Sequence, residues 1–265
     1  MLNRSYLTER SICDFRPRVR KNCCIRVPKD IIHDPDPATY DQELLFNSGN
    51  LPSFNSPDIN TVNIWPVAPI NTLNATIRNL STEASANQTR VDFRWSQWGI
   101  GMPRLPIGSV FVDLARAGFP GSEGTVSLPT PAAVIAAARY GIFVDIFHPY
   151  DSNNNNNHAE QTVDGFQTSG GRNRSFVVPI RNPTGSAQVI NLIAGPGPVV
   201  PWVNIVPATF TLGAGAQNNV MVSIAVPGAI PPSPPGTLIS ATVDVLATIG
   251  GAYLGGVSFL ILFDA

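Results

Sequence analysis

Proline interrupts this chain so often that a fold built on long helices is excluded. The sequence holds 25 prolines and 22 glycines in 265 residues, and a proline inside a helix costs about 3 kcal/mol. Collagen is excluded because the glycines follow no three-residue period. The hydrophobic content of 43% and the net charge of −1 exclude a highly charged disordered chain. The class that remains is a β-rich, turn-rich globular protein.

Alternating segments predict the strands of this protein. In residues 91–95, hydrophobic side chains alternate with Asp92 and Arg94, which is the two-residue period of a half-buried strand. Similar segments recur between residues 58 and 147 and again between 175 and 263, separated by glycine and proline turns. The sequence therefore predicts an all-β fold of two tandem Ig-like β-sandwiches with an extended N-terminal arm.

The predicted organisation has three parts. Residues 1–55 form a basic, cysteine-containing N-terminal arm, which cannot bury a core by itself. Residues 56–163 form the first sandwich, and residues 164–265 form the second.

Charge is scarce in this sequence and unevenly distributed. Charged residues make up 13% of the chain, whereas about 25% is usual. Residues 1–27 carry seven basic and two acidic side chains, a net charge of +5, and the remainder carries −6. Residues 182–265 contain no Lys or Arg, and their acids are Asp244 and Asp264. Such a surface either meets other protein or is a neutral Ser/Thr/Asn surface, and the sequence leaves both interpretations open.

The arm holds the residues that we expect to contact other subunits. Its three cysteines are an odd number and cannot all form intrachain disulfides; intersubunit disulfides and free cytosolic thiols both remain open. The basic side chains are expected to lie on the acidic surface of a neighbouring copy. The cysteines are Cys13, Cys23 and Cys24, and the arm-contact residues are Arg16, Arg18, Arg20 and Lys21.

Three segments of the first predicted sandwich resemble the bacterial cell-adhesion-related Ig-like module called CARDB. They are Ser-Pro-Asp-Ile at 56–59, Asn-Ala-Thr-Ile-Arg-Asn-Leu-Ser at 74–81 and Val-Asp-Phe-Arg-Trp-Ser at 91–96. The asparagine-rich stretch 147–161 is similar to the closing turn of that family, and Leu80 departs from the family's preference for glycine. The resemblance implies an Ig-like fold and carries little information about function.

Residues 166–265 resemble a second bacterial Ig-like domain. The supporting segments are Ile-Arg-Asn-Pro-Thr-Gly at 180–185, Pro-Trp-Val at 201–203 and Thr-Leu-Gly at 211–213. The resemblance implies a spacer or interaction unit without an active site, although fold alone does not fix function.

A calcium loop is one interpretation of the asparagine tract. Asp151, Asn153 and Asn155 fit positions 1, 3 and 5 of such a loop. However, Asn156 stands where the loop needs glycine, and Thr162 stands where it needs glutamate. A solvated turn is the favoured interpretation. We therefore predict no metal site and no cofactor, and keep the three residues as the weak calcium candidate.

Trp98 is the glycan-binding candidate. It follows a predicted strand in the stretch Gln-Trp-Gly-Ile-Gly-Met-Pro, where an exposed loop would let its ring stack on a sugar. A core position is nevertheless the favoured interpretation, because sandwich cores need large hydrophobic side chains.

No catalytic motif is present. The segment Gly121–Gly124 lacks the preceding glycine of a nucleophile elbow because Pro120 occupies that position. The glycine pairs 250–251 and 255–256 are interpreted as turn or bulge glycines. We therefore expect a protein that is not an enzyme and has no small-molecule substrate.

The predicted function is that of a structural subunit, forming a homo-oligomer or polymer (a fibre or filament, a sheath or a surface assembly) with or without other assembly proteins. One alternative is an adhesive or carbohydrate-binding module. The other is a nucleic-acid or membrane binder that uses the basic arm, of which nucleic acid is the less favoured partner. The sequence shows no 18-residue apolar segment and no secretory signal, so we expect synthesis in the cytosol and leave an extracellular or surface destination open.

Overall fold

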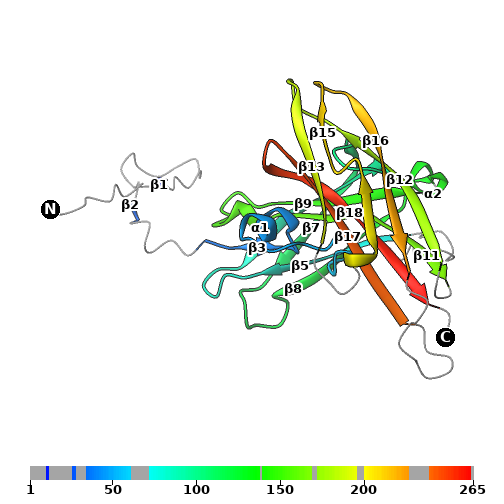
Figure 1. The fold of residues 1–265 in the computed structure, drawn as a ribbon. Coiled ribbons are helices and arrows are strands. Elements are labelled where there is room, and N and C mark those ends of the chain that lie inside the picture. Colours follow the sequence, from blue (N-terminus) through cyan, green and yellow to red (C-terminus); the bar gives the residue numbers. More distant parts are fainter. Residues whose placement is uncertain are drawn as a thin grey trace.

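The computed structural model describes residues 10–11, 26–27, 34–60, 72–137, 139–168, 172–195, 200–226 and 239–263, and it is nearly all β (Figure 1). Its helices are short: α1 (Gln42–Asn47), α2 (Ala132–Ala136) and the 3₁₀ turns η2 (Asn154–Asn156) and η3 (Val200–Trp202). Neither α-helix of this described part has the length and apolarity to cross a bilayer.

The first sandwich consists of two four-stranded sheets. One sheet has the order β10-β9-β6-β7, and in the other β5 pairs with β3, β4 and β8. The strands are β3 (Pro37–Ala38), β4 (Ile59–Asn60), β5 (Thr72–Asn79), β6 (Ala86–Gln97), β7 (Leu105–Leu114), β8 (Glu123–Pro129), β9 (Tyr140–Phe147) and β10 (His158–Gln161). Alternate residues of β5 (Leu73, Ala75 and Ile77) are fully buried against Val91 and Phe93 of β6, as the two-residue period predicts.

The second sandwich consists of a five-stranded sheet, β11-β18-β17-β13-β15, and a three-stranded sheet, β12-β16-β14. The strands are β11 (Val163–Thr168), β12 (Asn173–Arg181), β13 (Gln188–Ala194), β14 (Val203–Val206), β15 (Thr209–Leu212), β16 (Gln217–Ala225), β17 (Ile239–Ile249) and β18 (Ala252–Phe263). Inward side chains such as Val220, Val222 and Ile224 meet Val245 and Phe259 of the facing sheet. The prediction of an all-β chain of two tandem Ig-like sandwiches is therefore confirmed.

The arm does not end where the sequence suggested. Its short strands β1 (Arg10–Ser11) and β2 (Arg26–Val27) pair with each other. Residues 34–55, in contrast, belong to the folded body: β3 pairs with β5, and α1 docks on β10. The predicted 1–55 arm is therefore wrong for residues 34–55, because polar turn formers in this segment bond to distant strands.

The connection between β6 and β7 reaches into the second sandwich. The amide of Ile100 donates to the Pro179 carbonyl, and the amide of Arg181 donates to the Ile100 carbonyl, both at 2.9 Å. Gly99 and Gly101 adopt φ angles of +134° and +69°, and a Cβ on either would collide with a carbonyl of β12. Glycine is required there because the two backbones approach so closely.

Phe54 completes the contact between the sandwiches. Its side chain is fully buried, and a methyl group on Gly256 of β18 would overlap its ring. Asp244 of β17 holds the same segment, accepting from the Phe54 amide and the Ser53 hydroxyl at 3.0 Å each. These contacts, with residues 98–101, are called the domain junction below.

We predict that Phe54→Ala lowers the free energy of unfolding by about 3–5 kcal/mol, since it empties a fully buried site. Phe111→Ala is the matched control, because the Phe111 side chain is 58% exposed and surface changes fall within about 0.5 kcal/mol. Urea unfolding, followed by tryptophan fluorescence, measures the free energy of unfolding of both variants. Similar small losses of stability in the two variants would contradict the importance of Phe54 at the junction.

Candidate functional site

The predicted arm residues cannot be placed. Cys13, Cys23 and Cys24 lie outside the described residues, and so do Arg16, Arg18, Arg20 and Lys21.

The asparagine tract forms a turn that holds the N-terminal segment. Asp151 accepts hydrogen bonds on both carboxylate oxygens, from the Asn153 amide at 2.9 Å and from the Asn157 side chain at 2.7 Å. The Asn155 amide bonds back to the Asn153 side chain, and Asn156 reaches Asp36 at 2.8 Å. Burial raises the pKa of Asp151. Among the described residues, no group of three or more His, Cys, Asp or Glu is arranged to hold a metal ion.

Trp98 is a core residue, as the favoured interpretation of the sequence predicted, and not the exposed loop residue that glycan binding would need. Its side chain is 8% exposed and packs edge-on against Phe259 of β18, with ring centroids 6.0 Å apart. The loop after β6 carries it into the core of the second sandwich, so its ring is not available to stack on a glycan.

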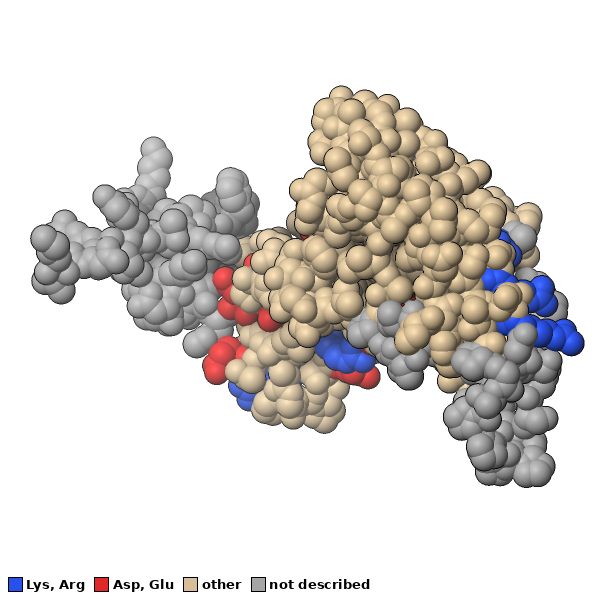
Figure 2. Space-filling view, viewed as in Figure 1, with Lys and Arg blue, Asp and Glu red and all other residues tan. Residues whose placement is uncertain are grey.

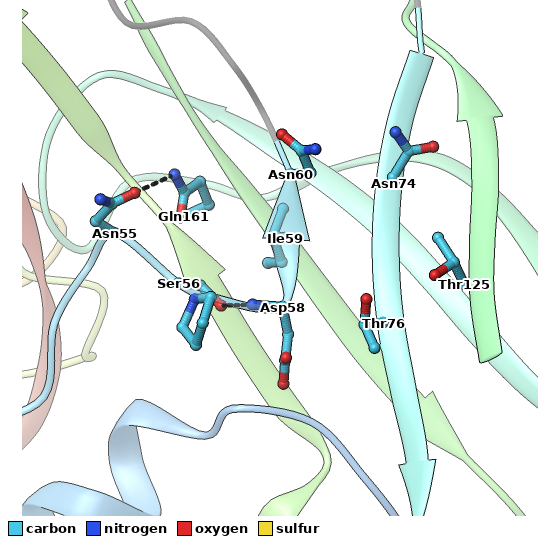
Figure 3. Close-up of a pocket in the computed structure, with 10 residues that line it drawn as sticks. Asn55, Ser56, Asp58, Ile59, Asn60, Asn74, Thr76, Thr125 and Gln161 are labelled. Carbon is cyan, nitrogen blue, oxygen red and sulfur yellow. Dashed lines mark hydrogen bonds between the residues drawn. The ribbon is translucent and has the colours of Figure 1, made fainter. Parts of the chain in front are cut away.

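A polar pocket of about 370 Å³ lies on the outer side of β5 and β8 (Figure 3). Its floor carries outward side chains of these two strands, because the inward ones form the core. In Figure 3, Asn55 and Gln161 stand on one side, joined by a hydrogen bond, and Thr76 and Thr125 stand on the other. The lining residues are Asn55, Ser56, Pro57, Asp58, Ile59, Asn60, Asn74, Thr76, Thr125 and Gln161.

The charge at this pocket is neutralised. Both carboxylate oxygens of Asp58 lie 2.7 Å from Nη1 of Arg78, and the Tyr40 amide donates to Oδ2 at 2.7 Å. The pKa of Arg78 is raised, chiefly by its hydrogen bond to Asp58. The remaining polar lining side chains are amides and hydroxyls, which both donate and accept.

Glu160 is buried beneath the domain junction. Its carboxylate accepts from the Tyr253 and Thr162 hydroxyls, each at 3.2 Å, and from the Gly256 amide at 3.4 Å. Its main chain pairs with the side chain of Gln42 in α1. Burial raises the pKa of Glu160, and the nearby Arg104 guanidinium and these hydrogen-bond donors offset the rise only in part. A second buried acid, Asp244, also has its pKa raised by burial.

A charge network covers the outer face of β9 and β10. Asp145 lies 2.7 Å from Nδ1 of His158 and 3.2 Å from Nε of Arg94, while Arg104 lies 3.0 Å from Nε2 of His158. Because a guanidinium only donates, Nε2 accepts and Nδ1 donates to Asp145. Burial alone would raise the pKa of Asp145, but the hydrogen bond from His158 and the two arginines lower it. Both ring nitrogens are occupied, so His158 is not poised as a general base.

The three-stranded sheet of the second sandwich has an outer face with little charge. Val177, Met221 and Val206 are register partners across β12, β16 and β14, and their side chains are 44%, 42% and 55% exposed. Arg181, the last residue of β12, also lies at an outward position. We call the neutral outward side chains between the strand ends the uncharged sheet face: Ser175, Val177, Pro179, Asn204, Val206, Asn219, Met221, Ser223 and Ala225.

Charged side chains are also scarce on the rest of the surface of the second sandwich. In Figure 2, the part of the molecule formed by β13, β15 and β16 shows neither acidic nor basic side chains. Asp244, the one charged residue of the described part of 182–265, faces the domain junction.

No protein-family model and no curated protein matches this sequence. Among solved structures, the ASH/PapD-like domain of human CEP192 is 10% identical, with a TM-score of 0.24, and covers 38% of this chain and 80% of that domain. Native E. coli alpha-2-macroglobulin is 10% identical, with a TM-score of 0.27 over 78% of this chain. Red sea bream transglutaminase is 6% identical, with a TM-score of 0.26 over 83% of this chain. The match spans only 16% of the macroglobulin and 33% of the transglutaminase, and such scores carry no inference about function.

We predict that Glu160→Gln flattens the pH dependence of stability. An unfolded glutamate has a pKa of about 4.3. Because the folded-state pKa is raised, the stability contribution of Glu160 is fully present below the unfolded pKa. It is lost as the pH rises through the folded value, at up to about 1.4 kcal/mol per pH unit.

Urea unfolding from pH 4 upward tests this prediction. Wild type should lose stability relative to Glu160→Gln as the pH rises. Glu123→Gln is the control, because that carboxylate is 58% exposed. If the stability of Glu160→Gln falls with pH as steeply as that of wild type, burial of Glu160 does not cause this pH dependence.

Proposed function

We propose that this protein is a non-enzymatic structural subunit that associates with copies of itself through the uncharged sheet face. The observation that carries the proposal is the row of exposed apolar side chains, Val177, Met221 and Val206, bordered by neutral side chains on a face whose outward charge is Arg181 at the end of β12. The N-terminal arm supplies a second contact between subunits.

The composition of this face favours an interface over a free surface. Soluble β-proteins keep sheet faces and edges apart with charged side chains, Lys above all. Here the outward positions from Ser175 to Pro179 on β12, and all those of β14 and β16, carry none. An apolar row bordered by Ser and Asn resembles the apolar centre and polar rim of an interface.

A second copy is the partner that fits this face best. A charged partner would gain nothing from a neutral face, whereas two identical neutral faces pack without like-charge repulsion. A two-fold arrangement would place each apolar row on the other and each polar border on its counterpart. The domain junction supports this role, because it holds the face rigidly relative to the first sandwich.

The arm fits the same function through charge. Its net +5 opposes the −6 of the remainder, and exposed acids such as Glu43 and Asp113 lie on the folded body. We propose that the arm lies on this acidic surface of a neighbouring subunit, with Cys13, Cys23 and Cys24 available for intersubunit disulfides. Such contacts weaken as salt rises.

We predict that Met221→Lys weakens self-association at least tenfold, since it places a charge at the centre of an apolar contact and, in a two-fold pair, opposite its own copy. Ala214→Lys is the control, because it adds the same charge at an exposed turn of the same sandwich. Sedimentation equilibrium at micromolar concentration provides the measurement. A monomeric wild type, or equal effects of the two variants, would contradict the proposal.

We predict that the triple change Arg16→Glu, Arg18→Glu and Arg20→Glu weakens association at low salt, and that its difference from wild type shrinks as salt is added. Light scattering across a salt series measures this. If the triple variant associates with the same strength and salt dependence as wild type, the arm is not part of the interface. That result would not bear on the sheet face, which the Met221→Lys variant tests.

A further inference from the structure

We propose that the polar pocket on β5 and β8 binds a neutral, polyhydroxylated ligand of the sugar class. The pocket lies on the first sandwich, on strands that contribute nothing to the uncharged sheet face, so the two proposals stand or fall separately. Trp98 is buried and cannot stack on a sugar, so the proposed sugar site uses a different set of residues.

The neutrality of the ligand follows from the bonding of Asp58. This carboxylate is the charged group of the described lining. Both of its oxygens already accept from Nη1 of Arg78, and Oδ2 also accepts from the Tyr40 amide. The Asp58 side chain is 3% exposed, so it offers little field to an entering ion. A cation would compete with Arg78, and an anion would find no unpaired cation among the lining residues.

The pocket holds hydrogen-bonding capacity that the protein does not use. Gln161 is 5% exposed, and its side-chain oxygen is buried without a partner, while its nitrogen donates to Asn55 at 3.0 Å. An unmade buried hydrogen bond costs about 1–3 kcal/mol. A ligand hydroxyl that donates to this oxygen, once the Gln161 side chain turns toward the pocket, would remove that cost. Across the pocket, no hydrogen bond within the described part of the chain engages the hydroxyls of Thr76 or Thr125.

Sugars match this arrangement better than apolar ligands do. Each sugar hydroxyl donates and accepts, as do the amides of Asn60 and Gln161 and the threonine hydroxyls. An apolar ligand would leave these groups unpaired at a cost, whereas exposed Pro57 offers the apolar wall on which the C–H face of a sugar ring packs. The volume of about 370 Å³ suits one or two sugar rings and falls within the range of small-ligand sites.

The test is a titration of the isotope-labelled full-length protein, followed by amide NMR shifts. The probes are methyl α-D-glucopyranoside, methyl α-D-mannopyranoside, methyl β-D-galactopyranoside and N-acetylglucosamine. At least one should shift amides of residues 55–60 and Gln161 with millimolar affinity. Glucose 6-phosphate and glucosamine, the charged counterparts, should bind more weakly than the neutral sugars.

Variants of the floor complete the test. Thr76→Val with Thr125→Val keeps the side-chain shape and removes both hydroxyls, and should weaken binding at least tenfold. Thr211→Val on β15 is the matched control, because Thr211 is an exposed strand threonine away from the pocket, and should leave affinity unchanged. The proposal is overturned if no probe shifts the pocket amides, if the charged sugars bind more tightly, or if the floor variant binds like wild type.

Discussion

The packing of Phe54 on the bare backbone of Gly256 couples the two sandwiches, and the rest of the structure depends on that coupling. A side chain larger than hydrogen at position 256 would exclude the ring. With the ring in place, Asp244 can accept from the Phe54 amide and Glu160 can be covered. Trp98 and Ile100 then extend the core of the second sandwich from a loop of the first. Each sandwich keeps its own core cluster, and the junction joins the two through Phe54, Trp98 and Ile100.

The coupling of the sandwiches has consequences for function. Because the junction joins the sandwiches through buried contacts, the uncharged sheet face is held in a fixed position relative to the first sandwich. That is what a repeating assembly requires of its subunit, since each new contact must repeat the same geometry. The junction also buries two acids whose pKa values are raised, so its strength depends on pH.

The local alternation of hydrophobic and polar residues predicted the strands. Contacts between residues far apart in the sequence decided how the two sandwiches pack together. The alternation in residues 91–95 was sufficient to predict β6, and the absence of Lys and Arg after residue 182 already indicated the neutral surface. A core position was favoured for Trp98, but the partners of Phe54 and Trp98 could not be predicted, because both lie on β18, about 200 and 160 residues further along the chain. Gly256 was interpreted as a turn or bulge glycine, although its role is to admit a ring. The pocket was missed because its residues come from four separate segments.

Differential scanning calorimetry of the full-length protein tests the coupling of the sandwiches most directly. We predict a single transition whose calorimetric enthalpy equals its van't Hoff enthalpy, since the core of the second sandwich includes Trp98 and Ile100 from the first, and Phe54 is buried against Gly256 of β18. Two resolved transitions, with the first sandwich and the second unfolding independently, would contradict it.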